Sequence, residues 1–171
     1  MDQLTYFIVW FIKYFLPPMI ANASPLLVKG SSMIDFGRKF VDGKPLFGRN
    51  KTWEGFLIGV YMGFSTALAL SIVVDEPSLL FIGLGAVFSA LIGDLFGSFI
   101  KRRLDIKSGD PFPVLDQLDF IFFTIIFYAL LDVKEFLLHP DYIFYACILV
   151  LTLHIVTNNI AYYLGVKDKR W

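Results

Sequence analysis

The chain has 171 residues, of which 57% are hydrophobic, and its 15 basic residues balance its 15 acidic residues. This apolar content is well above that of an ordinary soluble domain, and a net charge of zero provides no overall field that would recruit nucleic acid. The single cysteine, Cys147, lies in an apolar stretch, which excludes a disulfide framework and a multi-cysteine metal site within this sequence.

Five apolar stretches are long enough to cross a bilayer core, which needs about 20 mostly apolar residues. They are residues 4–23, 53–74, 79–100, 113–131 and 142–164. We therefore expect an all-α, polytopic integral membrane protein with five transmembrane helices, in which residues 1–171 form a single membrane-embedded domain. The N-terminal sequence has no basic start and no small-residue cleavage site, so the first stretch is expected to be retained rather than removed as a signal peptide.

The distribution of Lys and Arg predicts the orientation, because cytoplasmic loops carry an excess of these residues. Residues 24–52 contain six of them, residues 101–107 contain four and residues 167–170 contain three. Alternation through five helices places all three segments on one side, together with 13 of the 15 basic residues. We therefore expect the N-terminus outside the cell membrane, and the C-terminus and the long loop after the first helix in the cytoplasm.

The first stretch contains charged and helix-breaking residues. Lys13 lies near its middle, where a charge is expensive, so this residue either marks a functional interior or pairs with a carboxylate. Pro17 and Pro18 are expected to interrupt the hydrogen-bond ladder of the helix. Asn22, at the cytoplasmic end, is a candidate for binding a ligand or for satisfying a backbone group that the prolines free.

Small and polar residues mark two other stretches. Gly55, Gly59 and Gly63 recur every four residues, a stripe that favours close helix packing. His154 and Asn158 lie one turn apart in the fifth stretch. We expect His154 to form a hydrogen bond between helices, because no second histidine or cysteine lies near it in sequence to complete a metal site.

The segment from residue 93 to residue 119 interrupts the apolar pattern with clustered charges. Its cations are Lys101, Arg102, Arg103 and Lys107, and its carboxylates are Asp94, Asp105, Asp110, Asp116 and Asp119. Asp94, Ser98 and Lys101 recur at i, i+4 and i+7, so they share one face of a helix that is leaving the membrane. Residues 108–113 contain glycine and two prolines, which are expected to break the helix there.

Clustered carboxylates beside clustered cations suit a phosphorylated substrate bound with a hard divalent cation. Mg²⁺ usually bridges one or two carboxylates to substrate phosphates, and Lys and Arg bind the remaining phosphate charge. Asp94 lies inside the end of its stretch, where an unpartnered carboxylate is costly, so a bound cation is the simplest explanation for it. Asp116 and Asp119 share a face of the following helix, where they either join this site or only complement the helix dipole.

A second basic segment precedes the second apolar stretch. Gly43, Gly48 and Lys51 depart from a Walker motif, since the lysine comes two residues late and no soluble strand precedes the segment. Lys51 and the free N–H groups at the helix start are still able to receive phosphate, unless the lysine only marks the cytoplasmic boundary.

Several of these motifs together resemble a known family. The motifs are Gly93-Asp94, Ser98-x-x-Lys101-Arg102, Lys107 and the acidic pair Asp116-x-x-Asp119. They resemble the signature of the integral-membrane CTP-dependent cytidylyltransferases, the CDP-diacylglycerol synthases. Residues 42–55 and 22–25 resemble the archaeal branch of this family, the CDP-archaeol synthases. Two departures from the bacterial pattern are that two residues separate Asp110 from Lys107, and that a shorter Pro-Phe-Pro-Val replaces a turn with histidine and glycine.

The resemblance implies transfer of CMP from CTP to the phosphate of an unsaturated archaeal ether lipid, digeranylgeranylglyceryl phosphate, with release of pyrophosphate, in membrane phospholipid biosynthesis. It implies Mg²⁺ as the cofactor, CTP, a lipid phosphate and membrane lipids as partners, and no nucleic acid; it leaves the oligomeric state open, a homodimer included. The residues implied in catalysis are Asp94, Lys101, Arg102, Asp116 and Asp119. Those implied in binding Mg²⁺ are Asp94, Asp116, Asp119 and Asp110. Those implied in binding nucleotide or phosphate are Lys51, Ser98, Lys101, Arg102, Lys107, Asp110 and Asn22.

Two alternatives fit the same residues. A CTP-dependent polyprenol or phytol kinase would release CDP instead of pyrophosphate, and a cation transporter would use Asp94 with Asp116 and Asp119. Four cations beside the pathway disfavour the transporter, because they would repel the ion. Within the cluster, Arg102 is expected to hold phosphate in a bidentate manner that lysine cannot copy, whereas Arg103, one step round the helix, is expected to tolerate Lys.

Overall fold

The computed structural model describes residues 2–112 and 114–165, and over this part of the chain the fold is all-helical. The helices are α1 (Gln3–Ala23), the 3₁₀ turn η1 (Ser24–Leu27), α2 (Trp53–Val73), α3 (Ser78–Arg103), α4 (Leu115–Leu130), α5 (Lys134–Leu137) and α6 (Pro140–Tyr163). Only two isolated β-bridges, both involving the loop after η1, supplement them in the described residues. The expectation of an all-α fold is confirmed.

Four of the five expected spans are long and apolar enough to cross a membrane. They are Gln3–Leu27, Trp53–Val73, Ser78–Arg103 and Pro140–Ile160. The expected span over residues 113–131 corresponds to α4, which has 16 residues. Its length is therefore about 24 Å, less than the ~30 Å of a hydrocarbon core. Pro113, at the start of that expected span, lies outside the described residues.

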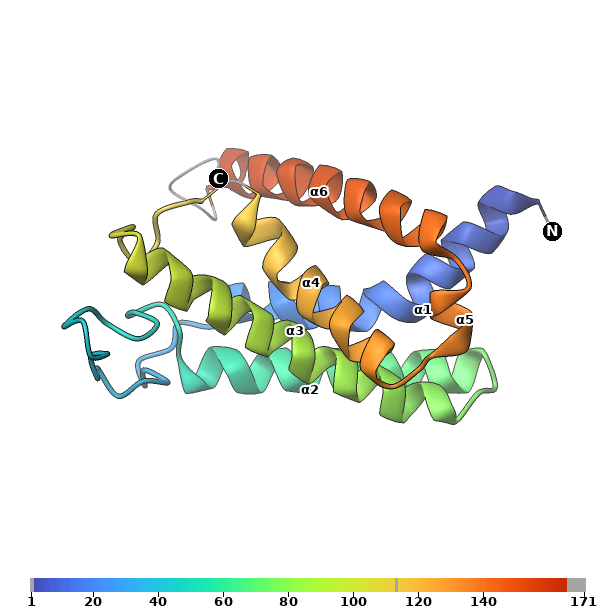
Figure 1. Cartoon of the computed structure of the whole chain (residues 1–171), viewed down its shortest axis with the longest axis horizontal. Coiled ribbons are helices and arrows are strands. Elements are labelled where there is room, and N and C mark those ends of the chain that lie inside the picture. The colour runs from blue at the N-terminus through green and yellow to red at the C-terminus, as the bar shows by residue number, and fades with distance from the viewer. Residues whose placement is uncertain (1, 113, 166–171) are drawn as a thin grey trace.

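The helices form a bundle in which α3 packs against α1, α2 and α4, while α6 packs mainly on α4 and α1 (Figure 1). The loop of residues 28–52 and the turn of residues 104–112 lie at one end of the bundle, which we call the loop end. The α2–α3 connection and α5 lie at the opposite end, which we call the α5 end (Figure 1). The two basic segments inside the described residues therefore share one end, as the distribution of charge requires.

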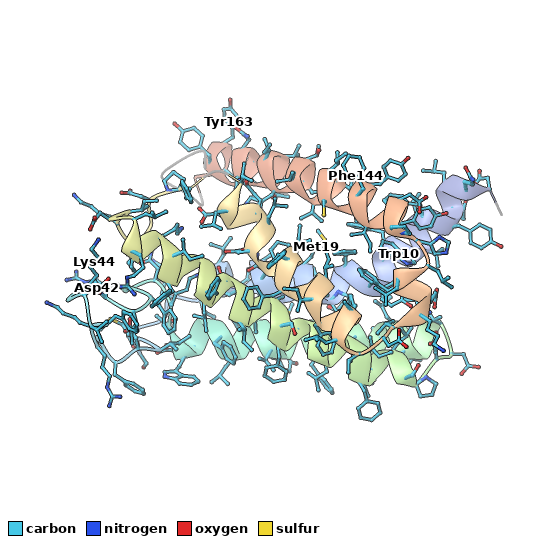
Figure 2. All side chains as sticks on the ribbon, in the orientation of Figure 1. Trp10, Met19, Asp42, Lys44, Phe144 and Tyr163 are labelled. Atoms are coloured by element: carbon cyan, nitrogen blue, oxygen red, sulfur yellow. The ribbon has the colours of Figure 1, made fainter. Side chains whose placement is uncertain are left out.

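Glycine allows α2 to approach its neighbours closely. A Cβ atom on Gly59 would lie 2.8 Å from the carbonyl oxygen of Ala21 in α1, and one on Gly63 would lie 2.6 Å from the side chain of Val87 in α3. No side chain fits at such distances, so the prediction of a packing stripe is confirmed. On the outer faces, large apolar side chains such as Phe144 of α6 point away from the bundle, as expected for contact with lipid (Figure 2).

Helix α1 continues through both prolines, although its hydrogen-bond ladder is interrupted as expected. Pro18 has no N–H group, so the carbonyl of Tyr14, four residues earlier, has no donor within the helix. The hydroxyl of Tyr128 in α4 donates to this carbonyl at 2.7 Å. A side chain from a neighbouring helix therefore replaces the missing backbone bond, and α1 does not end at the prolines.

Lys13 pairs with carboxylates at the α5 end. Its Nζ lies 2.9 Å from Glu76 in the α2–α3 connection and also contacts Glu135 in α5, while the Tyr14 hydroxyl donates to Glu135 at 2.9 Å. The Lys13 side chain is only 8% exposed. Of the two interpretations of this lysine, the structure shows the ion pair, which joins three elements of the bundle.

Candidate active site

A cavity of about 520 Å³ opens at the loop end, between α1, α3, α4 and α6. The loop before α2 and the turn after α3 complete its walls. Its charged lining residues are Lys51, Asp94, Lys101, Arg102, Asp110 and Asp116. Ser98 and Asn22 line it as well. The structure thus brings together eight of the residues that the sequence analysis selected, from segments that are far apart in the chain.

The end of α3 supplies one wall of this cavity. Asp94, Ser98 and Lys101 all face it, which agrees with the helical face expected from their spacing. The helix ends at Arg103, five residues before the segment 108–113 whose glycine and prolines were expected to break it. The end has the geometry of a Schellman motif: Asp105 has a φ of +60°, and the N–H of residue 106 donates to the Lys101 carbonyl at 3.0 Å. This early turn brings residues 108–111 over the cavity.

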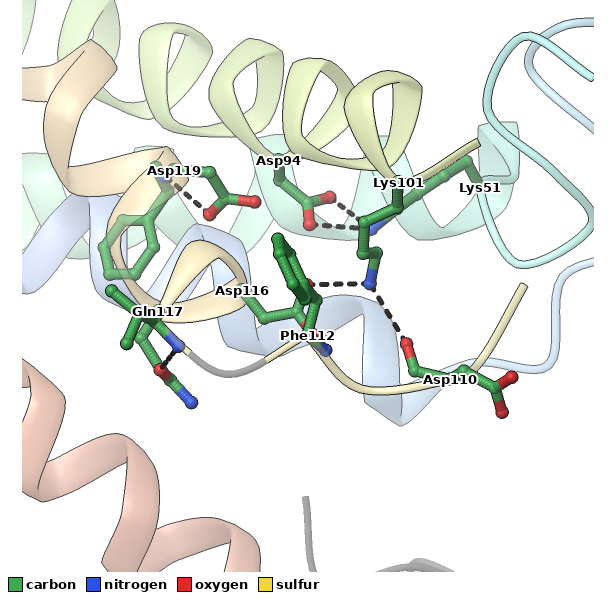
Figure 3. A network of polar contacts seen from close by, with 10 residues as sticks. Lys51, Asp94, Lys101, Asp110, Phe112, Asp116, Gln117 and Asp119 are labelled. Atoms are coloured by element: carbon green, nitrogen blue, oxygen red, sulfur yellow. Dashed lines mark hydrogen bonds and ion pairs between the residues drawn. The ribbon is translucent and has the colours of Figure 1, made fainter. Parts of the chain in front are cut away.

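Asp94 is neutralised by a lysine from a distant part of the chain. The Nζ of Lys51 lies 2.7 Å and 2.6 Å from the two carboxylate oxygens of Asp94 (Figure 3). Lys51 directly precedes Thr52, the residue that caps the N-terminus of α2. The sequence analysis took a bound cation as the simplest partner for Asp94. In this structure the partner is Lys51. Because Lys51 also lines the cavity, its ammonium group is able to contact a bound anion.

A second lysine–carboxylate pair joins α3 to α4. The Nζ of Lys101 lies 2.7 Å from Asp116, and it also donates to the backbone carbonyl of Asp110 at 3.4 Å (Figure 3). The other carboxylate oxygen of Asp116 accepts the N–H of Phe112 at 2.8 Å. Lys101 therefore holds together the helix end, the turn and the start of α4.

Asp119 is buried between α3 and α4 and does not line the cavity. A Cβ atom on Gly97 would lie 2.2 Å from its Oδ2, so the glycine of α3 is what leaves room for this carboxylate. Its Oδ1 accepts the N–H of Phe120 at 2.7 Å. Figure 3 shows Asp119 beside Asp94, and the two carboxylates interact electrostatically. Asp119 thus lies behind the wall of the cavity, next to Asp94.

The carboxylates do not form a closed metal cage. Within residues 2–112 and 114–165, no group of three or more His, Cys, Asp or Glu side chains is arranged to hold a metal ion. The site of four carboxylates expected from the sequence is not assembled here, because Asp94 and Asp116 are paired with lysines and Asp119 lies behind them. Two carboxylates that face one cavity do fit Mg²⁺, which is commonly held by one or two carboxylates together with substrate phosphates.

Arg102 brings a largely buried positive charge to the cavity. Its side chain is largely buried, with 6% of the residue exposed, and its Nε has no hydrogen-bond acceptor in the described part of the chain. Gly48, with a φ of +100°, passes directly beside it, and a Cβ at that position would lie 2.9 Å from Nη1. A buried donor without an acceptor is costly, and an anion in the cavity next to Arg102 would supply one.

Two predicted features lie elsewhere on the surface of the loop end. Lys107 is exposed on the turn and is not among the residues that line the cavity. Its role in binding phosphate stays a prediction. Arg103 does not line the cavity and contacts Asp42 and Pro45 of the long loop instead, and the expectation that it tolerates Lys stays a prediction.

Other cavity residues were not selected from the sequence. Asn50, Ser108 and Gln117 line the cavity, and the backbone N–H of Asn50 donates to the Ser108 hydroxyl at 3.3 Å. Ser108 was interpreted only as part of a helix-breaking segment, although its place in the charged segment was a usable signal. His154 and Asn158 of α6 also line the cavity, so the polar pair of the fifth stretch faces the same site.

Comparison with known proteins identifies the family. A family model described as CarS-like, CDP-archaeol synthase, matches residues 3–171. The chain belongs to the CDP-archaeol synthase family. It is 61% identical to the CDP-archaeol synthase of Staphylothermus marinus over 166 residues, which covers 97% of this chain and 94% of that one. It is 41% identical to the CDP-archaeol synthase of Pyrobaculum islandicum, with full coverage of both chains.

A solved structure supports the same assignment. It is described as an intramembrane enzyme for archaeal membrane lipids biosynthesis, and it is 35% identical to this chain with a TM-score of 0.78. The match covers 86% of this chain and 91% of the other. Together with the four apolar helices, this similarity shows a multi-pass membrane protein of the CDP-archaeol synthase family.

Proposed function

We propose that this chain is a cytidylyltransferase that joins CMP from CTP to the phosphate of an unsaturated archaeal ether lipid. The observation that carries the proposal is the largely buried guanidinium of Arg102, whose Nε has no acceptor in the described residues and which lines the cavity together with Lys51 and Lys101. Three cations around one cavity match the high negative charge of a triphosphate and a lipid phosphate. We propose further that residues 1–171 act as one catalytic domain, since four helices and both connecting segments contribute to the cavity.

In the proposed reaction, an oxygen of the lipid phosphate attacks the α-phosphorus of CTP. The bond from that phosphorus to the bridging oxygen of the β-phosphate breaks, and pyrophosphate leaves. A phosphate monoester is already anionic near neutral pH, so no strong general base is needed. Catalysis then rests on alignment of the two anions and neutralisation of their repulsion. Arg102 binds phosphate in a bidentate manner. Lys51 and Lys101 leave their carboxylate partners and contact phosphate oxygens instead.

The proposed cofactor is Mg²⁺, held by Asp94 and Asp116 together with phosphate oxygens. When bound, it would supply positive charge that offsets the negative charge of the reacting phosphates. Asp119 lies behind the cavity wall, next to Asp94, and Asp110 lines the cavity. The donor set supports this proposal because all of these ligands are the oxygen ligands that Mg²⁺ prefers.

The lipid is proposed to approach along the apolar wall of the cavity. Leu16 and Met19 of α1 and Val150 and Leu153 of α6 supply apolar lining of the cavity. Isoprenoid chains would remain in contact with these side chains while the phosphate reaches the charged wall. CTP, which is fully polar, would enter from the loop end.

We propose that the loop end faces the cytoplasm, with the N-terminus outside and α4 completing five crossings. The positions of the two basic segments support this orientation, whereas Lys167, Lys169 and Arg170 of the basic tail lie outside the described residues. Labelling of single cysteines in a Cys147→Ser background tests it. We expect a cysteine at residue 107 to be protected from an impermeant external reagent and one at residue 75 to react. The opposite pattern would contradict the orientation.

The reaction itself is tested with purified protein, Mg²⁺, a lipid phosphate and each of the four nucleoside triphosphates in turn. We expect CTP to give a lipid whose mass has increased by one CMP unit, together with pyrophosphate. Release of CDP and phosphorylation of an added polyprenol would instead support the kinase alternative. If no nucleotide is consumed, the proposed transferase function is wrong.

A further inference from the structure

The tip of the long loop is docked on the end of α3 through Arg103. The guanidinium of Arg103 lies over the ring of Phe99, one turn earlier in α3, at 4.3 Å from its centroid, and over Phe40 of the loop at 5.2 Å. Its Nε lies 2.8 Å from a carboxylate oxygen of Asp42, and an Nη atom donates to the carbonyl of Pro45. One side chain thus makes a cation–π contact, an ion pair and a hydrogen bond to the same loop.

Lys44 reinforces this contact from the loop side. Its Nζ donates to the backbone carbonyl of Arg103 at 2.9 Å and lies 2.7 Å from Asp105 (Figure 2 shows Asp42 and Lys44 together at the loop end). The carbonyl of Arg103 is at the C-terminus of α3, where the helix dipole favours a cation. We call the set of Phe40, Asp42, Lys44, Phe99 and Arg103 the loop clasp.

The loop clasp is connected to the cavity by a short, well-bonded segment. The N–H groups of Phe47 and Gly48 donate to the buried carboxylate of Asp35 at 3.0 Å and 3.2 Å. Burial alone would raise the pKa of Asp35, but these bonds outweigh it and hold the pKa below its ordinary value. Phe47, Asn50 and Lys51 then line the cavity. No flexible spacer separates the clasp from Lys51, since only six residues lie between Lys44 and Lys51.

We infer that Arg103 is a positioning residue for the transferase reaction. It lies outside the cavity, yet by holding the loop tip on α3 it fixes the wall that carries Asn50 and Lys51. This inference rests on the proposed function and deepens it, because it makes a residue that touches no substrate responsible for the geometry of CTP binding. It also revises the expectation that Arg103→Lys costs little activity, because lysine lacks the planar, multi-donor group that contacts the Phe99 and Phe40 rings while it reaches Asp42 and Pro45.

The variant Arg103→Lys tests the inference against the matched control Arg38→Lys. Arg38 lies in the same loop, but its side chain is exposed and takes no part in the clasp. For Arg103→Lys we expect the KM for CTP to rise about tenfold, the factor that corresponds to ~1.4 kcal/mol of lost interaction. We expect kcat to change much less, because the cavity residues themselves are retained. Arg38→Lys should leave both constants unchanged.

Limited trypsin digestion supplies a readout that does not depend on activity. Trypsin cleaves after both Lys and Arg, so neither substitution alters the number of cleavage sites. We expect the loop of residues 28–52 to be cut faster in Arg103→Lys than in wild-type protein or Arg38→Lys. Asp42→Asn should also increase the rate at which the loop is cut. The double variant Arg103→Lys, Asp42→Asn should be cut little faster than either single variant, since both substitutions remove the same contact.

The outcomes separate the inference from the proposed function. Inactive wild-type protein with CTP would refute the proposed function, while the digestion would still report on the clasp. Active wild-type protein, with Arg103→Lys matching Arg38→Lys in KM and in digestion rate, would overturn the inference alone. A fall in kcat and in unfolding temperature with an unchanged KM would also overturn it, because that pattern indicates a general loss of folded protein.

Discussion

The two ends of this bundle both bury cations near the membrane, but they treat them differently. At the α5 end, Lys13 is enclosed by Glu76 and Glu135, and the Tyr14 hydroxyl bonds the same carboxylate. At the loop end, Arg102 is buried to a similar degree, and its Nε has no acceptor in the described residues. Burying a charge is costly in both places. The ion pairs of Lys13 offset the first cost, whereas the Nε of Arg102 is left without an acceptor that a bound anion would supply.

The packing around the two cations shows the same contrast. Next to Lys13, the ring of Phe136 is stacked on Trp10 at 5.1 Å and lies 4.6 Å from the ring of Tyr128. Aromatic rings fill the α5 end of the bundle, beside the ion pair. Next to Arg102 lies a cavity of about 520 Å³ lined by both charged and apolar side chains. A paired charge at a filled end indicates a structural role, and a buried donor without an acceptor beside a cavity indicates binding.

The largest effect is expected from removing a carboxylate at the loop end. Asp94→Asn keeps the shape of the side chain but removes the charge that pairs with Lys51 and that would hold Mg²⁺. We expect turnover with CTP to fall on the order of 1000-fold, as for other losses of transition-state electrostatics. The exposed Asp132→Asn at the α5 end is the control and should retain wild-type turnover. Near wild-type activity of Asp94→Asn would remove this carboxylate from the site.

A smaller effect, on stability rather than chemistry, is expected from uncoupling the ion pair at the α5 end. The double variant Glu76→Gln, Glu135→Gln leaves Lys13 buried without a carboxylate. We expect a loss of about 2 kcal/mol of stability, less than for a fully buried pair because both carboxylates are partly exposed. Thermal unfolding in detergent measures it, with Asp75→Asn, Asp132→Asn as the matched double control. Normal stability together with lost transferase activity would mean that the α5 end has a catalytic role.

The smallest effect is a pH dependence confined to the α5 end. The hydrogen bond from Lys13 holds the pKa of Glu76 below its ordinary value of 4.5. A carboxylate with a lowered pKa in the folded protein contributes stability above its unfolded pKa and loses that contribution as the pH falls through the folded value. We therefore expect the difference in unfolding temperature between wild-type protein and Glu76→Gln to shrink as the pH is lowered below about 4.5. A constant difference would show that the ionisation of Glu76 is not coupled to folding.

The sequence predicted what depends on local spacing. The face of α3 that carries Asp94, Ser98 and Lys101 follows from the helical repeat, and the stripe of glycines in α2 packs as expected. The end of α3 was missed because Asp105 adopts the left-handed conformation that sequence rules assign mainly to glycine.

The ion-pair partners of the buried charges could not be predicted from local spacing. Lys51 is 43 residues from Asp94, and Lys13 is 122 residues from Glu135. Both pairs depend on how the loop and α5 fold back on the bundle. A candidate site was predictable because its charges stand out against apolar sequence. The burial of Arg102 beside the cavity was not predictable, because it depends on the path of the long loop past α3.

The most direct test of this contrast is the effect of CTP with Mg²⁺ on the unfolding temperature of three proteins: wild type, Arg102→Gln and Lys13→Gln. A ligand that binds the folded state raises the unfolding temperature according to its affinity. We predict that CTP stabilises the wild-type protein and, from a lower starting temperature, stabilises Lys13→Gln by a similar increment. Arg102→Gln should lose most of this increment, because the anion no longer meets the buried guanidinium. A full CTP-dependent shift in Arg102→Gln would contradict the account.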